Sequence, residues 1–237
     1  MELRLESRAL NEAVEATAQF FKTQRVVACC GDRFTLACLC LAEPIRRAVV
    51  GAATTEDEGF ELVLRHKPSL LICSSDLETG YGPCLLRRVK AEYPCCQLLI
   101  VLARETEEAV CEAMGAYADG VVFKSSLGTG RGDLISALQT IADGGVYYPE
   151  DICRIAASVP QPNLPGLVEE LTPRELEVVA AVSHGLKNNS IADRLGVSVE
   201  TVKTHVGNAM DKLGARDRTQ MAVTALLYGL IDPQGFG

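Results

Sequence analysis

Thiol, carboxylate, hydroxyl and lysine side chains follow four short apolar runs in the first two thirds of the 237-residue chain. They lie at Cys30–Asp32, Ser74–Asp76, Ala103–Glu105 and Lys124. Carboxylates that meet at one point could hold Mg²⁺, because this cation prefers carboxylate oxygens in near-octahedral geometry. A thiol close to a lysine could instead have a lowered pKa and sense oxidants. Metal-assisted phosphoryl chemistry and thiol chemistry are therefore both open to these residues.

All ten cysteines lie before residue 160, and several sit inside apolar runs such as VVACC and LACLCLA. The sequence has no CxxC pair, and the spacings present do not build a zinc site. In a reducing compartment such thiols behave as small apolar side chains, so most are predicted to be core residues. We predict no metal site and no cofactor.

The last third of the chain has the pattern of a helix-turn-helix. LTPRE (171–175) supplies a capping box and a proline at the first helical position. NNSIADRL (188–195) predicts a short second helix, Gly196 a turn, and Ser198 the cap of a third helix that ends at Gly214. Two short helices joined by a tight glycine turn place the second of them in the DNA major groove.

The third of these helices is predicted to have a core face and a DNA face. Its apolar positions share one side: Val202, Val206, Met210 and Leu213. The other positions are predicted to face solvent: Thr201, Lys203, Thr204, Gly207, Asn208 and Lys212. Lysine and asparagine read guanine and adenine edges, and a threonine methyl contacts thymine. This side of the helix is therefore predicted to contact DNA.

The elements that position the first group of residues alternate in type between residues 25 and 157. The apolar runs RVVACC, RAVVGAA, SLLICSS, QLLIVLA and DGVVFK have strand length, and helix-like stretches separate them. This alternation predicts an α/β fold with a doubly wound, five-stranded parallel sheet, and ligands bind such a sheet at the carboxyl ends of its strands. GTGRGD (128–133) has the wrong spacing for a nucleotide loop and is interpreted as a turn.

Composition divides the chain into four segments. VPQPNLPGLVEE (159–170) is rich in proline and disfavours helix, which indicates a linker. We predict an N-terminal amphipathic helix over 1–22, the α/β domain over 23–157, a linker over 158–170 and an all-helical domain over 171–237. The first helix either docks on its own domain or forms a dimer seam.

Composition also excludes several classes of protein. Apolar residues make up 48% of the chain and charged residues 23%, values that argue against a disordered or fibrous chain. No apolar run approaches the roughly 18 residues of a membrane span, so a cytoplasmic protein without membrane contact is predicted. The net charge of −8 belongs to residues 1–170, with 16 basic against 24 acidic residues, whereas residues 171–237 carry seven of each. A neutral tail can still present a basic face.

Residues 25–146 resemble the CheY-like receiver domain of bacterial response regulators. GDRFTLACL (31–39), PSLLICSSDLETGYG (68–82) and YADGVVFKS (117–125) carry the resemblance. It implies an acidic pair that binds Mg²⁺, an aspartate that accepts a phosphoryl group, and a Thr/Ser and a Lys that sense it.

Several of the implied residues are absent from this chain. The acidic pair falls on Gly31 and Asp32, or on Cys30 and Gly31 after a one-residue slip, and the aromatic switch position falls on Val121. The acceptor falls on Ser74 and the Thr/Ser on Ala103, so that only Asp32 and Lys124 remain. Lys124 is expected to pair with Asp32 or to extend into water. Loss of phosphorylation is predicted.

Residues 171–231 resemble the LuxR-type (NarL/FixJ) helix-turn-helix domain, through LTPRE, GLKNNSIA, LGVS, TVKTHV and KLGARDRTQ. The resemblance implies that Lys203 and Thr204 reach bases. It implies phosphate contacts from the following residues: Thr201, Asn208, Lys212, Lys187 and Arg194. The last helix (218–230) is implied to form a dimer contact. Ser190 and Gly207 depart from common family residues.

The sequence thus predicts a transcriptional regulator, not an enzyme, that binds double-stranded DNA as a homodimer. It has no catalytic residues, and another regulator or RNA polymerase is a candidate further partner. Three alternatives remain open. One is a phosphorelay receiver that uses Asp32 and Asp76; the second is a thiol-redox regulator that uses Cys30 or Cys73; the third is an adaptor whose receiver-like surface binds another protein.

Overall fold

The computed structural model describes residues 18–43, 45–127, 133–158 and 169–231. Contacts between residues divide the chain into two compact units, Met1–Ala142 and Asp143–Gly237. We call them the α/β unit and the helical unit. Of the predicted N-terminal helix, residues 18–21 are helical and residues 1–17 lie outside the described residues. Most of the GTGRGD turn and of the predicted linker also lie outside them.

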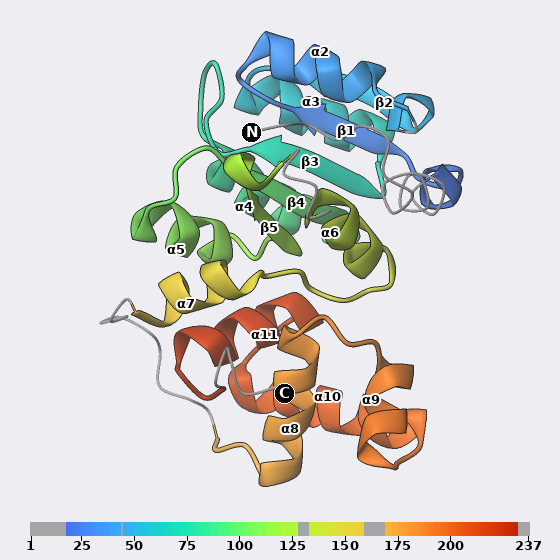
Figure 1. Cartoon of the computed structure of the whole chain (residues 1–237), viewed down its shortest axis with the longest axis vertical. Coiled ribbons are helices and arrows are strands. Elements are labelled where there is room, and N and C mark those ends of the chain that lie inside the picture. Colours follow the sequence, from blue (N-terminus) through green and yellow to red (C-terminus); the bar gives the residue numbers. More distant parts are fainter. Residues whose placement is uncertain (1–17, 44, 128–132, 159–168, 232–237) are drawn as a thin grey trace. The chain divides into compact units, whose positions relative to one another are not determined.

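The α/β unit contains one five-stranded parallel sheet in the order β2-β1-β3-β4-β5 (Figure 1). The strands are β1 (Val26–Cys29), β2 (Val49–Ala53), β3 (Leu70–Ser74), β4 (Gln97–Leu102) and β5 (Gly120–Phe123). Strands β1 and β5 are buried throughout, and β3 is buried up to its last residue. Near-continuous apolar runs of this kind are typical of a parallel sheet covered on both faces. The predicted fold is confirmed.

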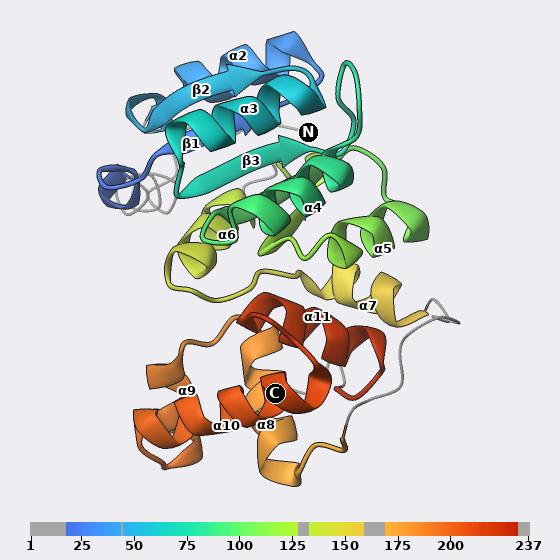
Figure 2. The ribbon, with the colours of Figure 1, turned by 180° about the vertical axis from the view of Figure 1, so that it is seen from behind.

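Five helices accompany the sheet: α2 (Arg33–Leu41), α3 (Glu56–His66), α4 (Gly82–Glu92), α5 (Glu107–Gly115) and α6 (Asp133–Ala142). Helices α2 and α6 lie on one face, and α3 and α4 lie on the other (Figures 1 and 2). Side chains cap three of the helices at their first turn, because Asp32, Thr55 and Thr106 each accept a hydrogen bond from a backbone N–H. These caps fix where each loop ends and each helix begins.

The helical unit contains α7 (Glu150–Ser158), α8 (Pro173–Ser183), α9 (Asn188–Leu195), α10 (Val199–Leu213) and α11 (Arg218–Leu227). The predicted capping box is present, since the Thr172 and Glu175 side chains each bond the other residue's backbone N–H. Gly196 ends α9 in a left-handed conformation with φ 64°, which gives the tight turn into α10. Helix α10 packs on α8, α9 and α11.

Helix α7 was not predicted as a separate element. The sequence-based boundary at 157 assigns its residues to the α/β domain, whereas contacts group α7 with the helical unit. The physical reason is an apolar face: Ile152, Cys153 and Ala156 are buried, and α7 packs on α11. No helix among the described residues is long and apolar enough to span a membrane.

Candidate functional site

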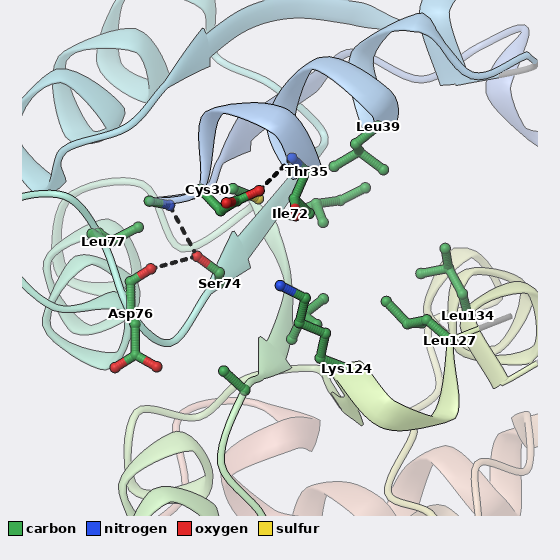
Figure 3. Close-up of a pocket in the computed structure, with 14 residues that line it drawn as sticks. Cys30, Thr35, Leu39, Ile72, Ser74, Asp76, Leu77, Lys124, Leu127 and Leu134 are labelled. Carbon is green, nitrogen blue, oxygen red and sulfur yellow. Dashed lines mark hydrogen bonds between the residues drawn. The ribbon is translucent and has the colours of Figure 1, made fainter.

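The structure brings six of the predicted residues together at the carboxyl ends of the strands. Cys30, Gly31, Asp32, Ser74, Ala103 and Lys124 all line one cavity of about 390 Å³ (Figure 3). Asp76, the residue of the shifted-register alternative, lines it too. The topology therefore places the groups as the sequence predicts, and the bonds that each group makes decide what it can do. We call this the strand-end cavity.

Asp32 serves as the cap of helix α2. Its Oδ1 accepts a hydrogen bond from the Thr35 backbone N–H at 2.6 Å. Hydrogen bonds from the Thr35 side chain and backbone lower the pKa of the Asp32 carboxyl below its ordinary value. The carboxylate is thus ionised and hydrogen-bonded to the first turn of helix α2. Asp32 and Lys124 form no ion pair.

Ser74 has no group beside it that would activate its hydroxyl. Its Oγ donates to the Asp76 carbonyl oxygen at 2.8 Å and accepts from the Gly31 backbone N–H at 3.3 Å. A serine becomes a nucleophile when a neighbouring base removes its proton. Here the proton points at a carbonyl oxygen, so the hydroxyl acts as a bridge between two loops.

Asp76 is held away from the centre of the cavity. Its Oδ1 lies 3.0 Å from Nη2 of Arg104, and its Oδ2 accepts from Ser75 Oγ at 3.2 Å. Figure 3 shows its carboxylate directed away from Ser74. The Asp32 and Asp76 side chains therefore do not converge on one point. The sequence analysis did not identify Arg104 as the partner of Asp76. The available signal was its position, directly after the implied Thr/Ser position at Ala103.

Gly31 occupies a position where no side chain fits. A Cβ built on it would lie 2.7 Å from the Asp76 carbonyl oxygen, 2.7 Å from the Leu77 carbonyl carbon and 2.8 Å from the Glu78 nitrogen. These are backbone atoms, which cannot move aside as the end of a flexible side chain can. The backbone of residues 76–78 thus fills the space that an acidic side chain at position 31 would need.

The receiver resemblance implies Mg²⁺, and the residues present do not fit this ion. Mg²⁺ sites need carboxylate oxygens that converge in octahedral geometry. Among the described residues, no group of three or more His, Cys, Asp or Glu side chains is placed to hold a metal ion. Asp32 alone, committed to its helix cap, does not replace such a group.

The thiols at the ends of strands β1 and β3 are not activated. Burial raises the pKa of Cys30 to about 11. The pKa of Cys73 is raised well above its ordinary value, mainly by a hydrogen bond involving the Cys29 thiol and secondly by burial. Both thiols therefore stay protonated near neutral pH, and the hypothesis of a lowered thiol pKa at this site is wrong.

The second group of predicted residues lies on the helix-turn-helix. Lys203, Thr204, Gly207 and Asn208 are exposed on helix α10, as predicted. Lys203 Nζ lies 2.7 Å from Glu200 Oε1, and both side chains are more than half exposed. Such an exposed pair is weak and can exchange for another anion at little cost. The outward side of α10 is therefore open to a partner.

The predicted core face of α10 is rotated slightly. Its buried residues are Val202, Ala209 and Leu213, whereas Val206 and Met210 are only half-buried. Helices α8, α9 and α11 pack on α10, and Val206 and Met210 lie at the edge of its buried side. This rotation moves the opposite edge of the helix, which carries Lys212, toward the interior.

The prediction that Lys212 faces solvent is wrong. Its Nζ lies 2.9 Å from Oε2 of Glu175, whose side chain is only 5% exposed. Burial raises the pKa of the Glu175 carboxyl, but the bonds from Lys212 and from the Thr172 backbone and hydroxyl outweigh it, so the pKa lies below its ordinary value. Lys212 thus neutralises the capping-box carboxylate at the start of α8.

The other predicted phosphate contacts differ in their surroundings. Lys187 is the N-cap residue of α9, and its Nζ lies 2.5 Å from Asp143 Oδ2. Arg194 is exposed. Thr201 is half-buried, and its hydroxyl lies 2.8 Å from that of Ser198, the cap of α10. Lys187 and Arg194 are thus accessible at the surface, whereas Thr201 belongs to the start of the helix.

Arg218 is a structural residue that the sequence analysis did not single out. Its guanidinium donates to Asn188 Oδ1 at 2.6 Å and to the Leu186 carbonyl oxygen, which ties the start of α11 to the start of α9. Burial lowers its pKa to about 10. An arginine inside the ARDR segment was the available signal. Its buried position fixes the turn that precedes α9.

The implied dimer contact of the last helix is covered within the chain itself. Most apolar residues of α11 are buried, including Ala222, Val223, Ala225 and Leu226, whereas Leu227 is half-buried. Helices α7, α8 and α10 pack on α11. Most of the apolar stripe of the last helix therefore packs in the core of the helical unit, and Leu227 is its half-buried member.

Comparisons with known proteins identify relatives of the chain. Residues 169–225 match the model of the family "Bacterial regulatory proteins, luxR family". The transcriptional regulatory protein YxjL of Bacillus subtilis is 30% identical over 188 residues, which cover 77% of this chain and 85% of that protein. The response regulator VraR of Staphylococcus aureus is 28% identical over 184 residues, with 77% and 86% coverage.

Solved structures share the fold. A complex of the response regulator RcsB with DNA is 20% identical, with a TM-score of 0.51 and coverage of 86% of this chain and 98% of that one. RcsB of Salmonella typhimurium is 21% identical, with a TM-score of 0.50 and coverage of 87% and 97%. At this level of identity, the likeness establishes only the fold.

A parallel α/β sheet and a helix-turn-helix with an open polar face together define a DNA-binding transcription regulator. The chain belongs to the NarL/LuxR family of two-component response regulators, with a receiver-like domain followed by a LuxR-type helix-turn-helix. Members of this family are transcription factors and not enzymes.

Proposed function

We propose that this regulator binds DNA without being phosphorylated. One observation carries the proposal: the backbone of residues 76–78 fills the space beside Gly31, where the first acidic side chain would have to stand. Because that loop also directs Asp76 toward Arg104, the two remaining carboxylates do not meet. The acceptor position carries Ser74 in place of a carboxylate, and the separated Asp32 and Asp76 do not form the metal site that phosphoryl transfer requires.

The outward side of helix α10 is the proposed DNA-reading surface. Lys203 and Thr204 contact base edges, and Asn208, Lys187 and Arg194 contact phosphates, with Thr201 beside them at the start of the helix. Lys212 is left out of the phosphate contacts because it neutralises Glu175. The exposure of Lys203, Thr204 and Asn208 supports this assignment.

The protein is proposed to bind DNA as a homodimer. One short helix in one major groove reads few base pairs, and two-fold half-sites about one helical turn apart are the geometric expectation for such a domain. Because most apolar side chains of the last helix are buried in its own unit, the dimer interface is expected to lie mainly on other surfaces. Sedimentation of the full chain with and without DNA measures the assembly.

The experiment that tests the main proposal treats the full chain with acetyl phosphate and Mg²⁺. Intact-mass measurement is expected to show no added phosphoryl group, and the affinity for DNA is expected to stay the same. A phosphoryl group mapped to Asp76 or Ser74, together with a rise in DNA affinity, would refute the proposal and restore the phosphorelay alternative.

A further inference from the structure

The strand-end cavity has an apolar interior. Its wall includes Leu39 from α2, Ile72 from β3, Val101 from β4, Leu127, and Leu134 from α6. A volume of about 390 Å³ falls within the range of sites for small molecules, which are mostly apolar with a few placed polar groups. Most of the exposed wall is apolar, so water finds fewer hydrogen-bond partners there than at a polar surface. The cavity therefore suits an apolar body better than a hydrated ion.

One cation is directed into this apolar space. The Lys124 side chain leaves the end of β5 and points into the cavity (Figure 3). Among the described residues, no carboxylate lies within ion-pair distance of its ammonium. The neighbouring carboxylates are engaged elsewhere, Asp32 by the Thr35 N–H and Asp76 by Arg104. Lys124 is thus a charge available to an incoming anion.

From this combination we infer that the strand-end cavity binds a small apolar molecule that carries a single carboxylate. The carboxylate pairs with Lys124, and the body lies against the side chains of Leu39, Leu127 and Leu134. A singly charged group fits better than a phosphate, because Asp32 and Asp76 at the same cavity repel a second negative charge.

The inference deepens the proposed function and rests on it, since one cavity cannot serve both a phosphoryl group and such a ligand. The ligand contacts side chains from α2, the strand ends and α6, and so binds only the folded α/β unit. Its binding is expected to raise the unfolding temperature of the full chain by mass action. A carboxylate ligand would then supply the input signal that phosphorylation does not.

The test titrates the full chain with matched compounds and follows binding by calorimetry. Naphthoate and octanoate serve as carboxylates, and naphthalenemethanol and octanol serve as their neutral counterparts. We expect saturable binding of at least one carboxylate and weaker binding of its alcohol. If neither carboxylate binds, or if each alcohol binds as tightly as its carboxylate, the inference is wrong.

Three variants locate the site. Lys124→Met keeps a side chain of similar length and removes its charge. It should weaken carboxylate binding by about tenfold without changing alcohol binding. Lys67→Met changes an exposed lysine that does not line the cavity, and should change neither. Ala103→Trp fills the cavity from an exposed position and should abolish both. Equal effects of the two lysine changes, or full binding by Ala103→Trp, would overturn the inference.

The outcome is separable from that of the proposed function. A phosphoryl mass gain with acetyl phosphate would refute phosphorylation-independence whatever the titrations show. Absence of carboxylate binding without any mass gain would remove only the ligand site.

Discussion

The strand-end cavity and the outward side of helix α10 both gather polar residues at positions that the family uses for function, but their bonds differ. At the cavity, Asp32, Ser74 and Asp76 each have partners inside the fold. On α10, Lys203 and Asn208 are exposed, and the one ion pair of Lys203 is itself at the surface. A polar side chain is therefore available for function only where the fold leaves its bonding capacity unused.

The largest effect is expected at Lys212, a residue of the DNA-binding helix that, like the polar residues of the cavity, is bonded inside the fold. Lys212→Ala removes the cation that pairs with the buried Glu175 carboxylate and should destabilise the chain by about 2–4 kcal/mol. Urea unfolding followed by circular dichroism measures it. Lys203→Ala breaks an exposed pair and is the matched control, with a change of less than about 1 kcal/mol.

The same pair gives a pH dependence with a defined sign. The pKa of Glu175 lies below its ordinary 4.5 in the folded chain, so its ionised form contributes stability at pH values above about 4.5. That contribution is lost as the pH falls through the lower folded pKa. The stability difference between the native chain and Lys212→Ala should therefore shrink in acid. A difference that stays constant down to pH 3 would contradict the assignment.

Lys203→Ala should act on DNA binding and not on folding. If Lys203 reads a guanine edge, its loss weakens binding by about 1–3 kcal/mol and relaxes the preference at that base pair. Glu200→Ala breaks the same ion pair but keeps the ammonium, so its DNA affinity should not fall. Fluorescence anisotropy with specific and scrambled duplexes measures both. An equal loss in the two variants would show that the ion pair matters and not the lysine.

Gly31→Ala tests whether the backbone of residues 76–78 excludes a side chain at position 31, where the family has an acidic residue. The new Cβ would meet the backbone of residues 76–78, and the overpacking should destabilise the chain by about 1–3 kcal/mol. Gly115→Ala is the control in the same unit, because a Cβ there has nothing within 4 Å. Thermal unfolding distinguishes them. If Gly31→Ala is as stable as Gly115→Ala, the argument against an acidic side chain at position 31 fails.

The smallest effect on stability is expected at Gly207, a glycine of the DNA-binding helix. A Cβ at Gly207 would also stand in open space, so Gly207→Ala should stabilise the chain by about 0.5–1 kcal/mol through helix propensity alone. If DNA approaches the backbone closely here, the same change should lower DNA affinity. Stabilisation without any loss of affinity would place the DNA contact elsewhere on α10.

Much of the fold and part of the site follow from local sequence. The capping box at Thr172 and Glu175 and the turn at Gly196 depend on backbone conformation and on hydrogen bonds within a few residues. The alternation of apolar runs with amphipathic stretches was sufficient to predict the sheet. It also predicted that Cys30, Ser74 and Lys124 would meet, because the carboxyl ends of parallel strands share one edge.

Only the tertiary structure decided what those residues do. Lys212 and Glu175 are 37 residues apart, and Arg104 lies 28 residues from Asp76, so no local pattern reveals either pair. The space beside Gly31 and the apolar cavity exist because loops and helices from distant parts of the α/β unit end there. The partners of long side chains and loop backbones depend on where these groups lie in three dimensions. Local sequence patterns do not determine those positions.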